Sequence, residues 1–97
     1  MATTLHELLS IVVEREASDL HLSCQTSPQI RIDGTLEALE QFERLASSDV
    51  QRLIYSVLTE PQRQRFEAGH DLDFSIDVEE LARFRCNVYR HFILDIR

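Results

Sequence analysis

The fold is decided by residues 71–89, DLDFSIDVEELARFRCNVY. Apolar and polar residues alternate on both sides of the pair Glu79-Glu80, which is typical of two half-buried strands joined by a turn. The apolar positions are Leu72, Phe74, Ile76 and Val78, then Ala82, Phe84, Cys86 and Val88. The stretch therefore predicts an antiparallel hairpin with one apolar face and one polar face.

Two arginines occupy the polar face of the second strand. Arg83 and Arg85 are two residues apart, so a strand places them about 7 Å from each other on one face. Such a pair suits bidentate contacts to phosphate oxygens. The hairpin register also places Asp77 opposite Arg83 and Ser75 opposite Arg85, with Asp73 on the diagonal. A cross-strand ion-pair ladder is therefore the alternative interpretation.

Upstream of the hairpin, three helices are predicted, at 4–16, 48–58 and 60–68. Apolar stripes of helical period indicate the first two. The third follows from the N-cap and early Pro of Thr59-Glu60-Pro61-Gln62 and from Gly69 at its end. Each begins at a capping-box or N-cap sequence, with Thr4, Ser48 and Thr59 as the predicted N-cap residues.

Between the first two helices, period-two alternation predicts strands at 19–24, around 30–32 and at 35–39. Asp33-Gly34 separates the last two and favours a two-residue type I′ turn. The predicted order is αβββααββ, an α+β fold whose mostly antiparallel sheet is covered by helices on one face. Residues 1–97 make a single domain of this kind.

The charge balance excludes several functions. The 97 residues carry a formal charge of −7, which opposes general binding to nucleic acid. Residues 81–97 are locally basic, with four arginines and one acidic residue. No apolar run approaches the length of a membrane span, and no signal-peptide pattern is present. We therefore expect a cytoplasmic chain with reduced thiols at Cys24 and Cys86, both on the apolar parity of strands.

Catalytic and metal-binding motifs are lacking. The sequence contains no Walker A motif, nucleophile elbow or zinc-binding spacing. His and carboxylate pairs such as Asp19 with His21 occur on one strand face, but a metal site needs three or more converging ligands. We therefore expect no catalytic residue, no metal site and no cofactor bound by this chain alone.

Four ordered motifs carry a resemblance to a known family. They are ASDLHLS at 17–23, PQIRIDG at 28–34, DLDFS at 71–75 and ARFRCN at 82–87. Together they resemble the N-terminal, PAS-like domain of the PilT-type secretion ATPases, motors that retract type IV pili and whose relatives drive pilus assembly and type II secretion. The resemblance ends near Val88, because the family continues with a Gly-containing turn and another strand, whereas this sequence continues as YRHFILDIR. The strand that ends near Tyr89 is the last one that the pattern predicts clearly, and a further strand after it stays open, as does the role of Arg90.

The resemblance implies a role. In this family the domain precedes a RecA-like ATPase domain, and six subunits form a ring with nucleotide between neighbours. It implies that Arg83, Arg85 and Arg90 contact nucleotide phosphates held by a neighbour, and that Asp19, His21 and Arg31 serve the fold and the interface.

The expected function follows from that role. It is a non-catalytic domain of a twitching-motility ATPase at the inner-membrane pilus machine, with a PilT-like ATPase domain or hexamer as partner and ATP with magnesium supplied by it. The alternatives are a stand-alone regulator that caps a pilus motor and a small-molecule-sensing PAS-like domain. The oligomeric state of the chain itself stays open.

Overall fold

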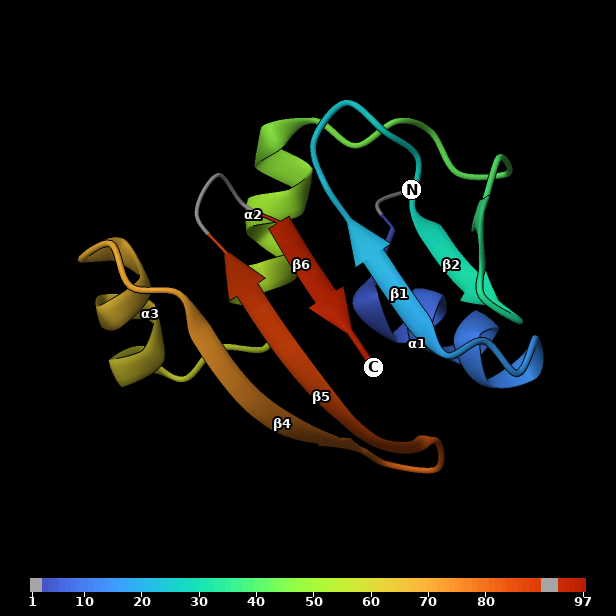
Figure 1. The fold of residues 1–97 in the computed structure, drawn as a ribbon. Helices are drawn as coiled ribbons and strands as arrows, with labels where there is room; N and C mark the ends of the chain where they lie inside the picture. Colours follow the sequence, from blue (N-terminus) through green and yellow to red (C-terminus); the bar gives the residue numbers. More distant parts are fainter. Residues whose placement is uncertain (1–2, 90–92) are drawn as a thin grey trace.

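A six-stranded antiparallel sheet in the order β3-β2-β1-β6-β5-β4 organises the molecule (Figure 1). The computed structural model describes residues 3–89 and 93–97. The strands are β1 (Asp19–Leu22), β2 (Gln29–Ile32), β3 (Thr35–Ala38), β4 (Leu72–Val78), β5 (Ala82–Tyr89) and β6 (Ile93–Ile96). The helices are α1 (Leu5–Glu14), α2 (Ser47–Tyr55) and α3 (Glu60–Glu67).

The α+β class with an antiparallel sheet is confirmed, but the predicted element order is one strand short. The additional strand, β6, lies between β1 and β5, so it joins the two halves of the sheet. Leu20 of β1 and Cys86 of β5 both pair with Ile96 of β6. The strand that the sequence pattern did not predict is therefore central to the sheet.

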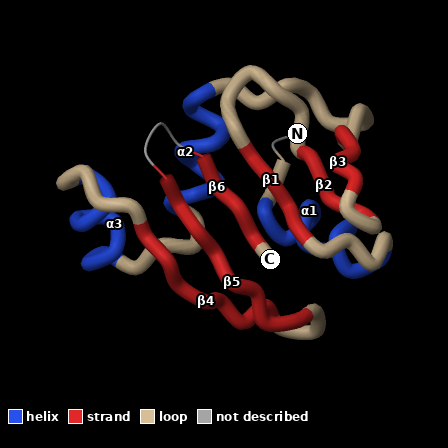
Figure 2. Tube along the Cα trace, in the orientation of Figure 1, coloured by secondary structure: helices blue, strands red, loops and turns tan. Residues whose placement is uncertain are grey.

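Two helices cover one face of this sheet. Figures 1 and 2 show α1 and α2 behind the strands, while α3 lies beside the edge strand β4. The inward-facing side chains of the central strands and the apolar stripes of α1 and α2 form one core. Its fully buried members include Leu8, Leu20, Leu22, Ile30, Leu53, Ile54, Cys86, Val88 and Leu94. The other sheet face is open and carries the polar residues.

The helix starts follow from local hydrogen bonds. Thr4 and Glu7 form the predicted capping box of α1, as do Thr59 and Gln62 at α3. The predicted N-cap of α2 was wrong by two residues, because Ala46 is the N-cap, Ser48 lies inside the helix, and the Asp49 carboxylate accepts from the Ala46 backbone N–H at 2.9 Å. In the described part of the chain, every helix is too short or too polar to cross a bilayer.

The turn between β2 and β3 also follows from local sequence. Asp33 and Gly34 have φ angles of 49° and 81°, as the predicted type I′ turn between β2 and β3 requires. A Cβ at Gly34 meets nothing within 4 Å, so glycine is favoured there by its backbone conformation rather than by space. This turn fixes the register that places Arg31 on the open face of the sheet.

Candidate functional site

The open face of the β4–β5 hairpin presents the two predicted arginines. The register confirms the expected pairing, with Arg83 opposite Asp77 and Arg85 opposite Ser75. Arg85 reaches the diagonal Asp73 through two hydrogen bonds, Nε to Oδ1 at 3.1 Å and Nη2 to Oδ2 at 2.6 Å. Arg83 Nε lies 3.8 Å from Asp77 Oδ1. In the chain without a partner, Arg83 and Arg85 therefore form the cross-strand ion-pair ladder. Their contact with phosphate stays a prediction.

These pairs are exposed, with 74% of the Arg83 side chain and 65% of the Arg85 side chain accessible. The hydrogen bonds from Arg85 lower the pKa of Asp73, while desolvation acts in the opposite direction. The same bonds raise the pKa of Arg85, so its guanidinium stays charged. Because exposed ion pairs are weak, an incoming anion can compete for these guanidiniums.

A second set of charges, which we call the β1 cluster, lies on the same face. The three predicted interface residues, Asp19, His21 and Arg31, meet there, joined by Asp95 and Arg97. Arg31 Nε donates to Asp19 Oδ2 at 3.0 Å, and Arg97 Nε lies 3.9 Å from the other carboxylate oxygen. His21 Nδ1 is paired with Asp95 Oδ1. These residues line a pocket of about 300 Å³.

Asp95 and Arg97 could not be assigned to this cluster from the sequence. Both depend on β6, which places Asp95 opposite His21. The alternation in Ile93–Ile96 is the one sequence signal for that strand, and four residues are too few to separate a strand from a loop.

The two regions are joined through a pair of arginines. Arg85 and Arg97 exchange both backbone hydrogen bonds, at 2.9 and 2.8 Å, so their side chains start from directly opposed positions. Like charges so placed repel, and each has a carboxylate partner, Asp73 for Arg85 and Asp19 for Arg97. The open face thus carries one continuous band of paired charges. The third predicted phosphate contact, Arg90, lies outside the described residues.

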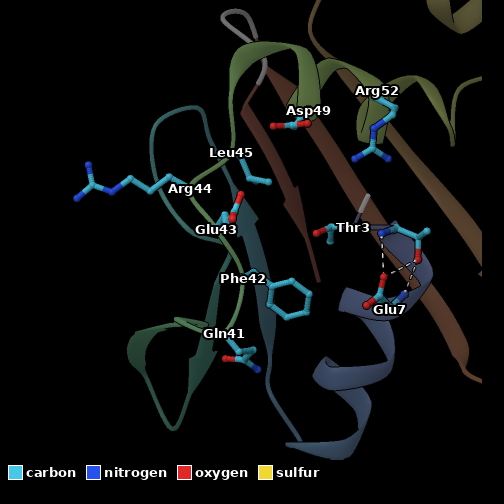
Figure 3. A pocket seen from close by; sticks show the side chains of 10 residues that line it. Thr3, Glu7, Gln41, Phe42, Glu43, Arg44, Leu45, Asp49 and Arg52 are labelled. Atoms are coloured by element: carbon cyan, nitrogen blue, oxygen red, sulfur yellow. Dashed lines mark hydrogen bonds between the residues drawn. The ribbon is translucent and has the colours of Figure 1, made fainter. Parts of the chain in front are cut away.

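The helix side carries a larger pocket of about 690 Å³ between α1, α2 and the segment 41–45 (Figure 3). Its lining mixes acidic and basic side chains, and Figure 3 shows Arg44 extending away from it. No predicted site residue lies there.

A nucleophilic cysteine requires a lowered thiol pKa, and a metal site requires converging ligands. Cys86 is fully buried, and desolvation raises the pKa of its thiol to about 11, as expected for a core residue. Within 3–89 and 93–97, no group of three or more His, Cys, Asp or Glu side chains converges on a point.

The fold and its motifs are those of the N-terminal region of PilT-type secretion ATPases, as comparison with known proteins shows. The type IV pilus retraction ATPase PilT of Pseudomonas aeruginosa is 40% identical over 83 residues, which is 86% of this chain and 24% of PilT. A crystal structure of the pilus retraction motor PilT with bound ADP superposes with a TM-score of 0.86 at 38% identity, covering 97% of this chain and 28% of that one.

A more distant structure shares the fold alone. The Legionella pneumophila ATPase DotB has a TM-score of 0.75 at 18% identity, covering 99% of this chain and 28% of that one. No protein-family model matches the chain. The chain spans about a quarter of the length of the relatives it matches.

Proposed function

We propose that this domain is a non-catalytic part of a PilT-like pilus motor, and that it packs the open face of its sheet against a neighbouring RecA-like ATPase domain. The carrying observation is the pair Arg83 and Arg85, exposed on β5 in a chain that is 40% identical to a pilus retraction ATPase. The proposal places the domain in the cytoplasm, at the inner-membrane pilus machine.

In this proposal the hairpin arginines contact the phosphates of a nucleotide that the partner domain holds together with magnesium. A guanidinium binds phosphate oxygens through parallel N–H bonds, and it stabilises charge that develops during phosphoryl transfer. Arg85 must exchange the Asp73 carboxylate for phosphate, and the exposure of this pair keeps that exchange inexpensive. When the phosphate leaves, the Arg85–Asp73 pair closes again. Nucleotide state is thereby linked to how tightly the domain docks.

The β1 cluster has a different part in the same proposal. Its residues are less exposed than the hairpin arginines and are held to each other by cross-strand pairs. We assign to Asp19, His21 and Arg31 a fixed polar contact with the partner domain that does not depend on nucleotide.

One observation favours a second candidate function, a regulator that caps a pilus motor without touching its nucleotide. Arg83 and Arg85 each already have a carboxylate partner within the chain. A cap that uses this face as a neutral, paired surface needs no phosphate.

The two candidates separate in one experiment. The chain is mixed with the ATPase domain of a PilT-type motor, with and without a non-hydrolysable ATP analogue, and the complex is sized by light scattering after gel filtration. For the double variant Arg83→Ala/Arg85→Ala we expect about tenfold weaker association in the presence of the analogue. The matched control, Arg63→Ala/Arg65→Ala on α3, should associate like the wild type.

Each outcome decides something. If the chain associated with the ATPase domain equally well with and without the analogue, and equally well in the Arg83→Ala/Arg85→Ala variant, the regulator that caps the motor would be favoured. Absence of any complex under all conditions would overturn both candidates.

A further inference from the structure

A mostly apolar groove of about 310 Å³ lies on the helix side of the sheet, away from the open face. It is bounded by the first half of α1, the second half of α2 and the end of β4. Its apolar lining comes from Leu5, Leu9, Leu53, Val57, Ile76 and Val78. Ile76 and Val78 face inward on the edge strand but are only half-buried, whereas Phe84 and Cys86 on the neighbouring strand are buried. The helices thus leave part of the apolar face of β4 open.

A cationic side chain without a partner stands at the rim of this groove. Among the arginines that the structure describes, Arg44, Arg52 and Arg65 form no ion pair within 4.0 Å. Of these three, Arg52 alone lines the apolar groove, together with His6. Figure 3 shows the guanidinium of Arg52 extending from α2 toward the side where Thr3 and Glu7 lie.

The carboxylates near Arg52, those of Glu7, Glu43 and Asp49, line the larger pocket that Arg52 also borders. Glu7 Oε1 accepts from the Thr4 backbone N–H at 3.2 Å, and Asp49 Oδ2 accepts from the Ala46 backbone N–H. No Asp or Glu is among the residues that line the apolar groove. The groove therefore combines apolar walls with one arginine at its edge that has no ion pair within 4.0 Å among the described residues.

We propose that this groove binds a carboxylate-headed amphiphile of the medium-chain fatty-acid class, with its chain against Ile76 and Val78 and its carboxylate on Arg52. Small-ligand sites typically have apolar walls and a few polar groups that orient the ligand, and the volume is at the lower end of their range. A guanidinium is the side chain best matched to a carboxylate. Because the groove is on the opposite side of the sheet from Arg83 and Arg85, this inference stands apart from the proposed function.

The test uses the full chain, labelled with nitrogen-15, and three probes at pH 7: decanoate below its micelle-forming concentration, decyltrimethylammonium with the same chain length and a cationic head, and acetate as the head group alone. We expect saturable shifts of the amide resonances of Leu9, Leu53 and Ile76 with decanoate. Decyltrimethylammonium should bind at least about fivefold more weakly, because it loses the ion pair. Acetate should not saturate.

Two variants locate the site. Arg52→Gln should weaken decanoate binding about fivefold, while the matched control Arg65→Gln should leave it unchanged. Equal binding of the two decyl probes, an unaffected Arg52→Gln variant, or shifts that map outside the groove would each overturn the proposal. It would also be overturned if, without any probe, these amides shifted with protein concentration, since a second copy of the chain would then be the occupant.

Discussion

The two charged regions of the open sheet face are built in different ways. The hairpin pairs join residues close in sequence, such as Asp77 and Arg83, and their side chains are more than half exposed. The β1 cluster joins residues as far apart as His21 and Asp95, 74 positions in sequence, and these two side chains are about one-third exposed or less. Local pairing thus produces a surface that an external anion can enter, and long-range pairing produces one that is fixed by the fold.

This difference assigns the regions separate parts in the proposed function. Exposed pairs exchange partners readily, as nucleotide-dependent contact requires. The β1 cluster is built on the neighbouring strands β2, β1 and β6, so the register of the sheet fixes which of its side chains face each other. The predictions below test that contrast.

The largest expected effect comes from the core beneath β6. Leu94 is fully buried there, so Leu94→Ala should lower the free energy of unfolding by about 3 kcal/mol. Ile76→Ala, at a half-buried position on the edge strand, should cost about 1 to 2 kcal/mol. Urea denaturation monitored by circular dichroism gives both values. Equal losses would contradict the view that the centre of the sheet, rather than the hairpin, carries the stability.

A smaller effect is expected in the β1 cluster. A double-mutant cycle with Asp19→Asn and Arg31→Gln should give a coupling of about 0.5 to 1 kcal/mol, reduced by solvent because the Arg31 side chain is 42% exposed. The matched cycle, Asp77→Asn with Arg83→Gln, should give no coupling outside experimental error. A larger coupling in the hairpin than in the cluster would reverse the comparison.

The smallest effect concerns the titration of Asp73. Its pKa is held below the ordinary value of 3.8 chiefly by the hydrogen bonds from Arg85, so Arg85→Gln should raise it toward that value. Arg97→Gln should raise it less, since Arg97 acts only through its charge. Carboxyl resonances followed by NMR against pH measure these shifts, with Arg83→Gln as the variant expected to leave Asp73 unchanged.

The direction of the pH effect on stability follows from the same pair. Because the pKa of Asp73 is lower in the folded chain than in the unfolded chain, its ionisation favours folding above the ordinary pKa. That contribution is lost as the pH falls through the lowered value. If Asp73 had the same pKa in the Arg85→Gln variant as in the wild type, the Arg85–Asp73 pair would not be formed in solution.

Features of the fold could be predicted from the sequence when the residues that form them are close together along the chain. The hairpin register, the Asp33-Gly34 turn and two of the three helix caps depend on residues that are neighbours in the chain, and the structure confirms them. The α2 cap was wrong because the N-cap residue is Ala46, whose side chain cannot cap, and the Asp49 carboxylate at the third helical position accepts from the Ala46 backbone N–H instead. The preference of Ser for N-cap positions therefore pointed to the wrong residue.

The rest required the tertiary structure. Nothing in Ile93–Ile96 indicates that this short strand pairs with β1, more than 70 residues earlier, so the places of Asp95 and Arg97 beside His21 and Asp19 could not be predicted. The groove beside Arg52 was missed for a related reason. A helical stripe predicts which side chains face the sheet, but not where the helices stop covering an edge strand.

The central claim is that the hairpin arginines make the nucleotide-dependent contact and the β1 cluster makes the constant one. The most direct measurement is titration calorimetry of the chain into the ATPase domain of a PilT-type motor, with and without a non-hydrolysable ATP analogue. We predict that Arg83→Ala/Arg85→Ala abolishes the gain in affinity that the analogue gives, whereas His21→Ala/Arg31→Gln weakens both titrations by the same factor. A hairpin variant that keeps the full gain would contradict the claim.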